Sequence, residues 1–176
     1  MKLLYFLLLT TVCFAQEVDS LYITPNGLNG YAVLKAPGSA EDLYNKSLEY
    51  LHLNFKQPDS IIKNKLPGKI LRWQGIYINK VEFYQNGSLV GASIQLLMDW
   101  RFQEGRVKYE IVDATVLVAG MPIFYKGGAF DSCFYNNRGE PRKRVEDIRI
   151  AADDFINKNM KEFENYLNGK TDLDDW

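Results

Sequence analysis

Apolar side chains recur at helical spacing between Ser39 and Lys56, the best-specified stretch of the chain. At about 100° per residue, four of them fall on one face: Tyr44, Leu48, Leu51 and Phe55. Ser39 precedes Asp42 by three residues, the spacing of a capping box in which each side chain binds the other residue's backbone N–H. Pro58 cannot continue a helix because it lacks the N–H donor. The pattern therefore predicts a helix over 39–56 that buries one narrow stripe.

A second, longer helical pattern runs from Pro141 to Asn168-Gly169. Proline suits a first helical turn, and glycine suits the position after the last. Apolar residues lie on one side of this span: Val145, Ile148, Ala152, Phe155, Ile156, Phe163 and Leu167. A helix of this length would be about 42 Å long, which is enough to cross a whole sheet.

Between the two helices the apolar residues alternate with polar ones, as they do in strands with one buried face. We predict a first strand near 31–36, before the first helix, and then strands near 60–65 and 69–78 that are joined by a turn at Leu66-Pro67-Gly68. Asn86-Gly87 between two apolar runs predicts a tight hairpin, because both turn residues need positive φ.

Two long strands follow that hairpin. Even-numbered residues from Ile94 to Phe102 are apolar, and after a turn at Gln103-Glu104-Gly105 the chain returns through Val107, Tyr109 and Ile111. The apolar phase then shifts by one residue, which predicts a β-bulge near Ile111-Val112. Strand, helix, four or more antiparallel strands and a long helix make an α+β fold, with two helices packed on one face of an antiparallel sheet.

Several short motifs resemble a known family. They are Asp42-Leu43-Tyr44-Asn45-Lys46 with Leu51 and Asn54-Phe55-Lys56 in the first helix, Gly68-Lys69-Ile70 at a strand start, and Tyr109-Glu110-Ile111 in a late strand. In these the chain resembles the exported bacterial "domain of unknown function 4468" family over roughly residues 31–167. The resemblance implies a TBP-like β-α-β(4)-α fold and an envelope protein of the Bacteroidota type. It brings no catalytic residues, and the segment 77–91 departs from it as an apparent inserted hairpin.

The first fifteen residues, MKLLYFLLLTTVCFA, have one lysine, an apolar run and small residues before Gln16. This pattern is typical of a secretory signal peptide, and its apolar run is too short to span a bilayer. We expect export to the periplasm or medium, without a transmembrane anchor. The expected organisation is a signal peptide (1–15), an N-terminal segment (16–30), one domain (31–168) and an acidic tail (169–176).

Composition narrows the function further. With 21 basic and 22 acidic residues the formal charge is −1, so no overall positive field favours nucleic acid as a partner. Cys133 is the single cysteine after the signal, which rules out an internal disulfide in the mature chain. His52 is the single histidine and has no partners at metal-ligand spacing. We therefore expect no metal and no cofactor.

Other polar groups carry weak signals. Cys133 with His52 as its base would make a nucleophile, although a cysteine packed between aromatic residues is the plainer interpretation. The acidic pair Asp153-Asp154 and the positive cluster Arg138, Arg142, Lys143 and Arg144 are interpreted as solvated charge. Gly127-Gly128 lacks the spacing of a phosphate loop.

The segment 120–140 has no clear period and is rich in aromatic residues. Its rings form the candidate ligand or partner site: Phe124, Tyr125, Phe130, Phe134 and Tyr135. Aromatic side chains on an irregular stretch supply contact area for little rotamer entropy. The alternative is that these rings fold back as a lid over the open end of the sheet.

No constellation of catalytic groups emerges, so the interpretation we favour is a non-enzymatic binding or protein-interaction module. One alternative is a carrier that holds an apolar small ligand between the sheet and the long helix, in a void lined by residues such as Trp100 and Phe155. A cysteine-dependent enzyme is the third. Possible partners are an envelope protein or an apolar small molecule.

Overall fold

The computed structural model of the 176-residue chain describes residues 16–24, 27–85, 87–118, 121–125, 134–136 and 138–170, with the backbone alone over 121–125. The elements in order are β1 (Gln16–Glu17), β2 (Ile23–Thr24), β3 (Gly27–Leu28), β4 (Gly30–Lys35), α1 (Ala40–Asn54), α2 (Pro58–Ile61), β5 (Ile62–Leu66), β6 (Ile70–Gln85), β7 (Ser88–Gln103), β8 (Arg106–Val118), β9 (Met121–Tyr125), the 3₁₀ turn η2 (Lys143–Val145) and α3 (Glu146–Leu167).

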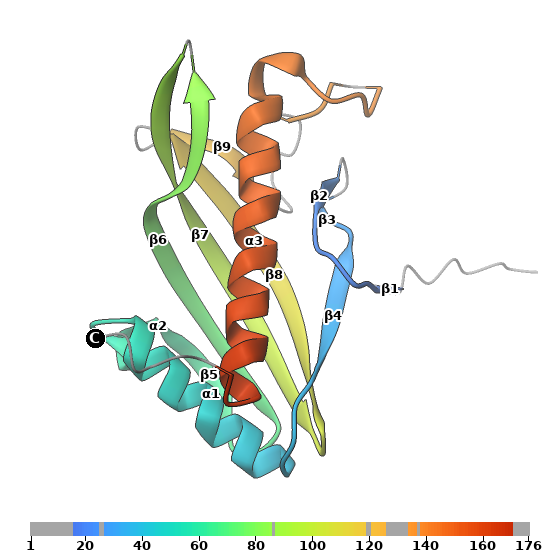
Figure 1. The fold of residues 1–176 in the computed structure, drawn as a ribbon, viewed down its shortest axis with the longest axis vertical. Coiled ribbons are helices and arrows are strands. Elements are labelled where there is room, and N and C mark those ends of the chain that lie inside the picture. Colours follow the sequence, from blue (N-terminus) through green and yellow to red (C-terminus); the bar gives the residue numbers. More distant parts are fainter. Residues whose placement is uncertain are drawn as a thin grey trace, which may run out of the picture.

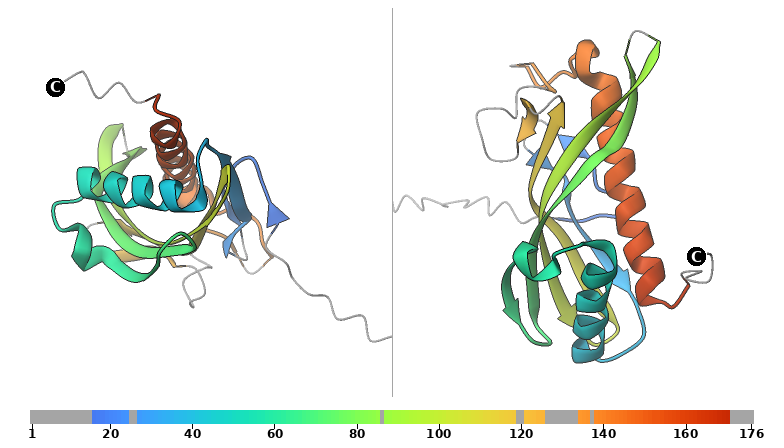
Figure 2. Two further views of the ribbon diagram at one scale, coloured as in Figure 1. Left: turned by 90° about the horizontal axis from the view of Figure 1, so that it is seen from below. Right: turned by 90° about the vertical axis from the view of Figure 1, so that its left-hand side faces the viewer.

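One seven-stranded sheet organises the molecule, in the order β1-β4-β8-β7-β6-β5, with β9 also paired to β8. Neighbouring strands are antiparallel except for β1 and β4. Both long helices contact the same side of the sheet and each other (Figure 1). Figure 2 shows that the sheet curves around that side. The predicted α+β class, with an antiparallel sheet and two long helices on one face, is confirmed.

Helix α1 begins where the sequence predicted. Ser39 Oγ accepts the Asp42 N–H at 3.1 Å, while the Asp42 carboxylate accepts the Ser39 N–H at 3.1 Å. The Ser39 bonds lower the pKa of Asp42. The predicted stripe, however, is rotated. The buried positions are Leu43, Tyr44, Ser47, Tyr50 and Leu51, whereas Leu48 and Phe55 are half-buried. Helix α3 is the reason, because it packs against the Tyr50 side.

The sequence suggested that the segment 77–91 is a separate inserted hairpin, and this prediction is wrong. The segment is the outer half of β6 and β7, which pair from Ile70↔Arg101 to Gln85↔Ser88. Three residues, Ile78 to Lys80, oppose one residue of β7, and Asn79 lies at φ 53°. Gly91 faces this bulge, where an added Cβ would stand 3.1 Å from the Asn79 Cβ. The bulge breaks the alternation of apolar residues, which explains the misinterpretation.

The bulge predicted near Ile111-Val112 is confirmed. Leu97 pairs with Asp113 and Met98 with Ile111, so Val112 is the extra residue of β8. Strand β9 pairs with β8 and was not predicted, because it lies in a stretch without a clear apolar period. The short strands β1 to β3 and the helical turn α2 were also not predicted. Pro58 ends no helix directly; it opens α2 after α1 has stopped.

Helix α3 begins later than predicted. Pro141 forms a bridge with Tyr135, and the Arg142 N–H binds the Phe134 carbonyl, so this backbone is extended rather than helical. The helix has 22 residues, or about 33 Å. Its buried residues are Ile148, Ala152, Ile156, Asn159, Met160, Phe163 and Leu167. Five of these residues belong to the predicted apolar side, namely Ile148, Ala152, Ile156, Phe163 and Leu167, so the orientation of the helix is as expected.

Candidate functional site

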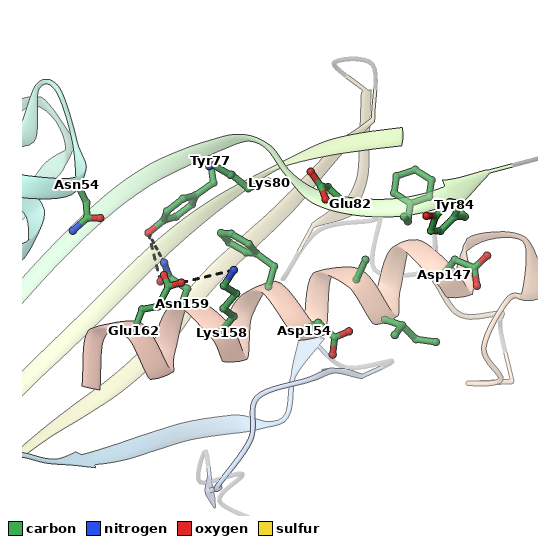
Figure 3. A pocket seen from close by; sticks show the side chains of 14 residues that line it. Asn54, Tyr77, Lys80, Glu82, Tyr84, Asp147, Asp154, Lys158, Asn159 and Glu162 are labelled. Carbon is green, nitrogen blue, oxygen red and sulfur yellow. Dashed lines mark hydrogen bonds and ion pairs between the residues drawn. The ribbon is translucent and has the colours of Figure 1, made fainter. Parts of the chain in front are cut away.

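A groove lies between the outer half of β6 and the first four turns of α3 (Figure 3). Its volume is about 800 Å³. We call it the α3 groove. It is lined by Asn54, Tyr77, Lys80, Glu82, Phe83, Tyr84, Asp147, Ile150, Ala151, Asp154, Phe155, Lys158, Asn159 and Glu162.

Aromatic and aliphatic side chains line the inside of the α3 groove. Tyr77 and Phe155 meet edge to face, with ring centroids 5.0 Å apart. Phe83, which is buried, lines the groove further along β6. At the outer end, Tyr84 is 68% exposed and Ile150 is 45% exposed. Exposed apolar side chains next to a concave surface are typical of sites that bind ligands or partners.

Asn159 closes the inner end of the groove. Its Oδ1 accepts the Tyr109 hydroxyl at 3.1 Å, and its Nδ2 donates to the Tyr77 hydroxyl at 3.3 Å. Burial raises the pKa of both tyrosines, well beyond the usual range for Tyr109. Both phenols are therefore neutral at physiological pH, so this end presents hydrogen-bonding groups and not a charge.

The rim of the groove is charged, and acidic groups outnumber basic ones. Four carboxylates (Glu82, Asp147, Asp154 and Glu162) stand against two amines (Lys80 and Lys158). Lys158 Nζ lies 4.0 Å from Glu162 Oε1, and Figure 3 marks this ion pair with a dashed line. Outside this ion pair, the described rim has three carboxylates, those of Glu82, Asp147 and Asp154, and one amine, that of Lys80. Histidine, cysteine and serine do not occur among the described residues of the lining.

The α3 groove exists because two elements diverge. The bulge at Ile78–Lys80 increases the twist of β6, and the outer hairpin rises past the start of α3 (Figures 1 and 2). The helix presents small or polar residues on this side, such as Ala151 and Asp154, and these do not fill the space. The groove was not predicted from the sequence, although the alternation of apolar and polar residues visibly breaks at Ile78–Lys80.

The opposite side of α3 is held by the N-terminal segment Leu21–Ile23. Asn157 both accepts the Leu21 N–H (2.9 Å) and donates to the Leu21 carbonyl (2.7 Å), as a strand partner would. Asp153 accepts the Ile23 N–H at 2.7 Å, and the Tyr135 hydroxyl donates to the Ile23 carbonyl at 2.6 Å. We call these contacts the N-terminal clasp. Leu21 and Ile23 are buried, so the clasp also completes the core.

Asp153 has an unusual environment within the clasp. Burial raises its pKa to about 6, although the Ile23 N–H and the Arg149 guanidinium, 2.8 Å away, act in the opposite direction. The acidic pair Asp153-Asp154 is thus divided between two functions. Asp153 belongs to the clasp, whereas Asp154 faces the groove. The interpretation of both as solvated charge was wrong for Asp153, which is only partly accessible.

The predicted aromatic site is only partly described. Phe134 and Tyr135 are buried in the core, and Tyr135 serves the N-terminal clasp. Phe124 and Tyr125 lie in β9, where the backbone alone is described. Phe130, Cys133 and Gly127-Gly128 lie outside the described residues. A shared surface of the five rings remains a prediction.

The remaining candidates are placed more simply. His52 is exposed on α1. In the positive cluster, the Arg142 side chain donates to the Tyr135 carbonyl at 2.9 Å and so has a structural contact. Within the described ranges no three His, Cys, Asp or Glu side chains are grouped to hold a metal. Trp100, expected to line a void in a ligand carrier, is instead buried and stacked on Phe163 at 4.0 Å.

The described helices include none that is long and apolar enough to cross a membrane. No protein-family model matches the sequence, and no curated protein matches it either. A solved structure does match: the crystal structure of a DUF4468 family protein from Bacteroides ovatus. The two chains are 14% identical, with a TM-score of 0.59, and the match covers 92% of this chain and 94% of the other. At this identity the match establishes the fold, and the resemblance seen in the sequence motifs is confirmed: this chain has the fold of a DUF4468 family protein.

Proposed function

We propose that this protein is an exported, non-enzymatic binding module whose ligand occupies the α3 groove. The observation that carries the proposal is the combination of an aromatic interior (Tyr77, Phe83 and Phe155) with a charged rim. Such a surface orients an amphipathic ligand, since apolar groups enter and polar groups stay at the edge. The signal-like residues 1–15 support the exported location, because they have the charge and apolar run of a secretory signal.

The proposed binding site is an open groove, and not the interior cavity that a carrier of an apolar ligand would need. Trp100, Tyr109 and Phe163 pack against one another where a carrier would need a void. Further along the helix, Phe155 lines open space. A ligand that contacts Phe155 therefore binds at the surface, and it can extend beyond the protein.

Titration with the apolar fluorescent dye 1-anilinonaphthalene-8-sulfonate tests this site. We expect one saturable, blue-shifted site on the folded protein. Ala151→Trp fills the groove from the α3 side and should abolish the signal. Leu53→Trp adds the same ring on an exposed position of α1 and is the matched control. Dye binding that is equal in both variants would refute the α3 groove as the binding site.

We also propose that the chain is a divergent member of the DUF4468 family, with the TBP-like core that the resemblance implies. The shared fold and the motifs in α1 and β8 support this. A sequence profile built from homologues of this chain tests it. Membership predicts that the profile aligns α1 and β8 of the two chains in register, and a profile that fails to connect them argues for a shared fold alone.

A further inference from the structure

We propose that the ligand of the α3 groove is a basic, extended peptide segment of a partner protein that adds as a strand to the free edge of β6. The inference rests on the proposed function and names the ligand class of that site. Three observations carry it: an unpaired strand edge, the length of the groove and the sign of its charge.

The edge of β6 is free where it borders the groove. Strand β5 pairs with β6 only from Leu66↔Ile70 to Ile62↔Trp73. From Gln74 to Gln85, β6 has β7 as its one strand partner among the described residues. Such an edge offers unpaired N–H and C=O groups to an incoming strand. The bulge at 78–80 interrupts this edge, so pairing takes place along Val81–Gln85, where Glu82, Phe83 and Tyr84 also line the groove.

The dimensions suit a short extended chain. Between Asp147 and Glu162 the groove follows about 22 Å of α3, at about 1.5 Å per residue. An extended peptide rises about 3.3 Å per residue, so about seven residues fill this length. A strand in this position would continue the curvature of the sheet toward α3. Alternate side chains would then point at Phe83 and Phe155.

The charge of the groove selects the peptide. Glu82 stands on β6, and Asp147 and Asp154 stand on α3, so carboxylates flank the groove on both walls. Lysine and arginine side chains are long enough to reach these carboxylates while their aliphatic stems lie on the aromatic interior. Among the described lining residues outside the Lys158–Glu162 pair, an acidic peptide would meet three carboxylates and one amine, that of Lys80.

Fluorescence anisotropy with a fluorescein-labelled peptide of about seven residues, in which lysine alternates with leucine and phenylalanine, tests the inference. We expect saturable binding, with affinity lower by tenfold or more when glutamate replaces each lysine. The double variant Glu82→Lys with Asp154→Lys should weaken the lysine peptide by at least tenfold. Asp59→Lys with Glu104→Lys makes the same change in charge at exposed positions outside the groove, and it should leave binding nearly unchanged.

Backbone N-methylation of the peptide, one residue at a time, separates strand addition from simple charge attraction. Pairing with β6 predicts loss of binding at every second residue, because alternate N–H groups point at the edge. Uniform effects along the peptide would overturn strand addition, and equal binding of lysine and glutamate peptides would overturn the charge assignment. If neither peptide binds but Ala151→Trp still removes the dye, the peptide inference fails and the groove stands. If the dye is also unaffected, both fail.

Discussion

The two halves of α3 rest on the same sheet in different ways. The C-terminal half is closed: Phe163 stacks on Trp100 at 4.0 Å, and Tyr50 packs on Phe163 at 5.0 Å. The N-terminal half is open, because Phe155 meets Tyr77 at the edge of a groove and not in a filled interior. One helix therefore provides both a core element and a candidate binding surface.

The difference shows how a surface can stay open without releasing its helix. The closed half is fixed by the burial of large rings, which stabilises through the apolar area removed from water. The open half is fixed from behind by the N-terminal clasp, whose hydrogen bonds run from Asp153, Asn157 and Tyr135 to the backbone of Leu21 and Ile23. Directional bonds on one side of α3 leave its other side free.

The largest expected effect tests the closed half against the open half directly. Phe163→Ala should lower the free energy of unfolding by about 3–5 kcal/mol, since it removes a fully buried ring and leaves a cavity. Phe155→Ala should cost about 1–2 kcal/mol, because that ring is half-buried. Urea denaturation measures both values. Equal losses would mean that the groove is filled and that the two halves do not differ.

Helix α1 packs against the closed half of α3 through Tyr50. Two substitutions test which side of α1 is buried. Leu51 is fully buried and Leu53 is 58% exposed. We expect Leu51→Ala to lower the free energy of unfolding by about 2–5 kcal/mol, and Leu53→Ala by far less. A large loss at Leu53 in thermal or urea unfolding would show that this side of α1 is covered.

Features that depend on residues close together in the chain could be predicted from the sequence, and features that depend on distant residues could not. The capping box of Ser39 and Asp42 and the bulge at Val112 were predictable, because each is specified by residues a few positions apart. The rotation of α1 was not, because the ring of Tyr50 is covered by α3, more than a hundred residues later in the chain. Pro141 was misjudged for the same reason, since its bridge to Tyr135 replaces a helical turn.

The groove was out of reach for a related reason. Phe155 appeared as one more residue of an apolar stripe, and nothing local distinguishes it from Phe163. The two residues differ because the bulge at Ile78–Lys80 twists β6, the strand beside Phe155, and this bulge lies more than seventy residues earlier in the chain. A bulge can be suspected from broken alternation, but the space that it opens depends on the whole sheet.

Asn159 lies between the open and closed halves of α3 and binds the hydroxyl groups of Tyr109 and Tyr77. Removing each hydroxyl should have a smaller effect on stability than the substitutions above. Tyr109→Phe removes the 3.1 Å hydrogen bond and leaves a buried amide oxygen without its best donor, which should cost about 1–2 kcal/mol. Tyr77→Phe removes a longer bond, of 3.3 Å, beside the groove and should cost less. Calorimetric unfolding of both variants measures the difference. The reverse order would place the stronger anchor of Asn159 on the groove side.

The smallest expected effect concerns the clasp behind the open half and depends on pH. Burial raises the pKa of Asp153 to about 6, from an ordinary value of 3.8 in the unfolded chain. Between these values the folded state binds more protons than the unfolded state, so the contribution of Asp153 to stability is complete below the lower pKa and declines as pH rises through about 6. Partial solvent access of the carboxyl screens the effect and keeps it small.

Asp153→Asn cannot ionise, yet its amide oxygen can still accept the Ile23 N–H. We therefore expect the wild-type protein to lose stability relative to this variant as pH rises from about 4.5 to 7, with Asp154→Asn, on the groove side of the same helix, as the matched control. Urea midpoints measured across that range decide the sign, and a wild-type protein that gains relative stability with rising pH would show that the ion pair with Arg149 outweighs burial in the clasp.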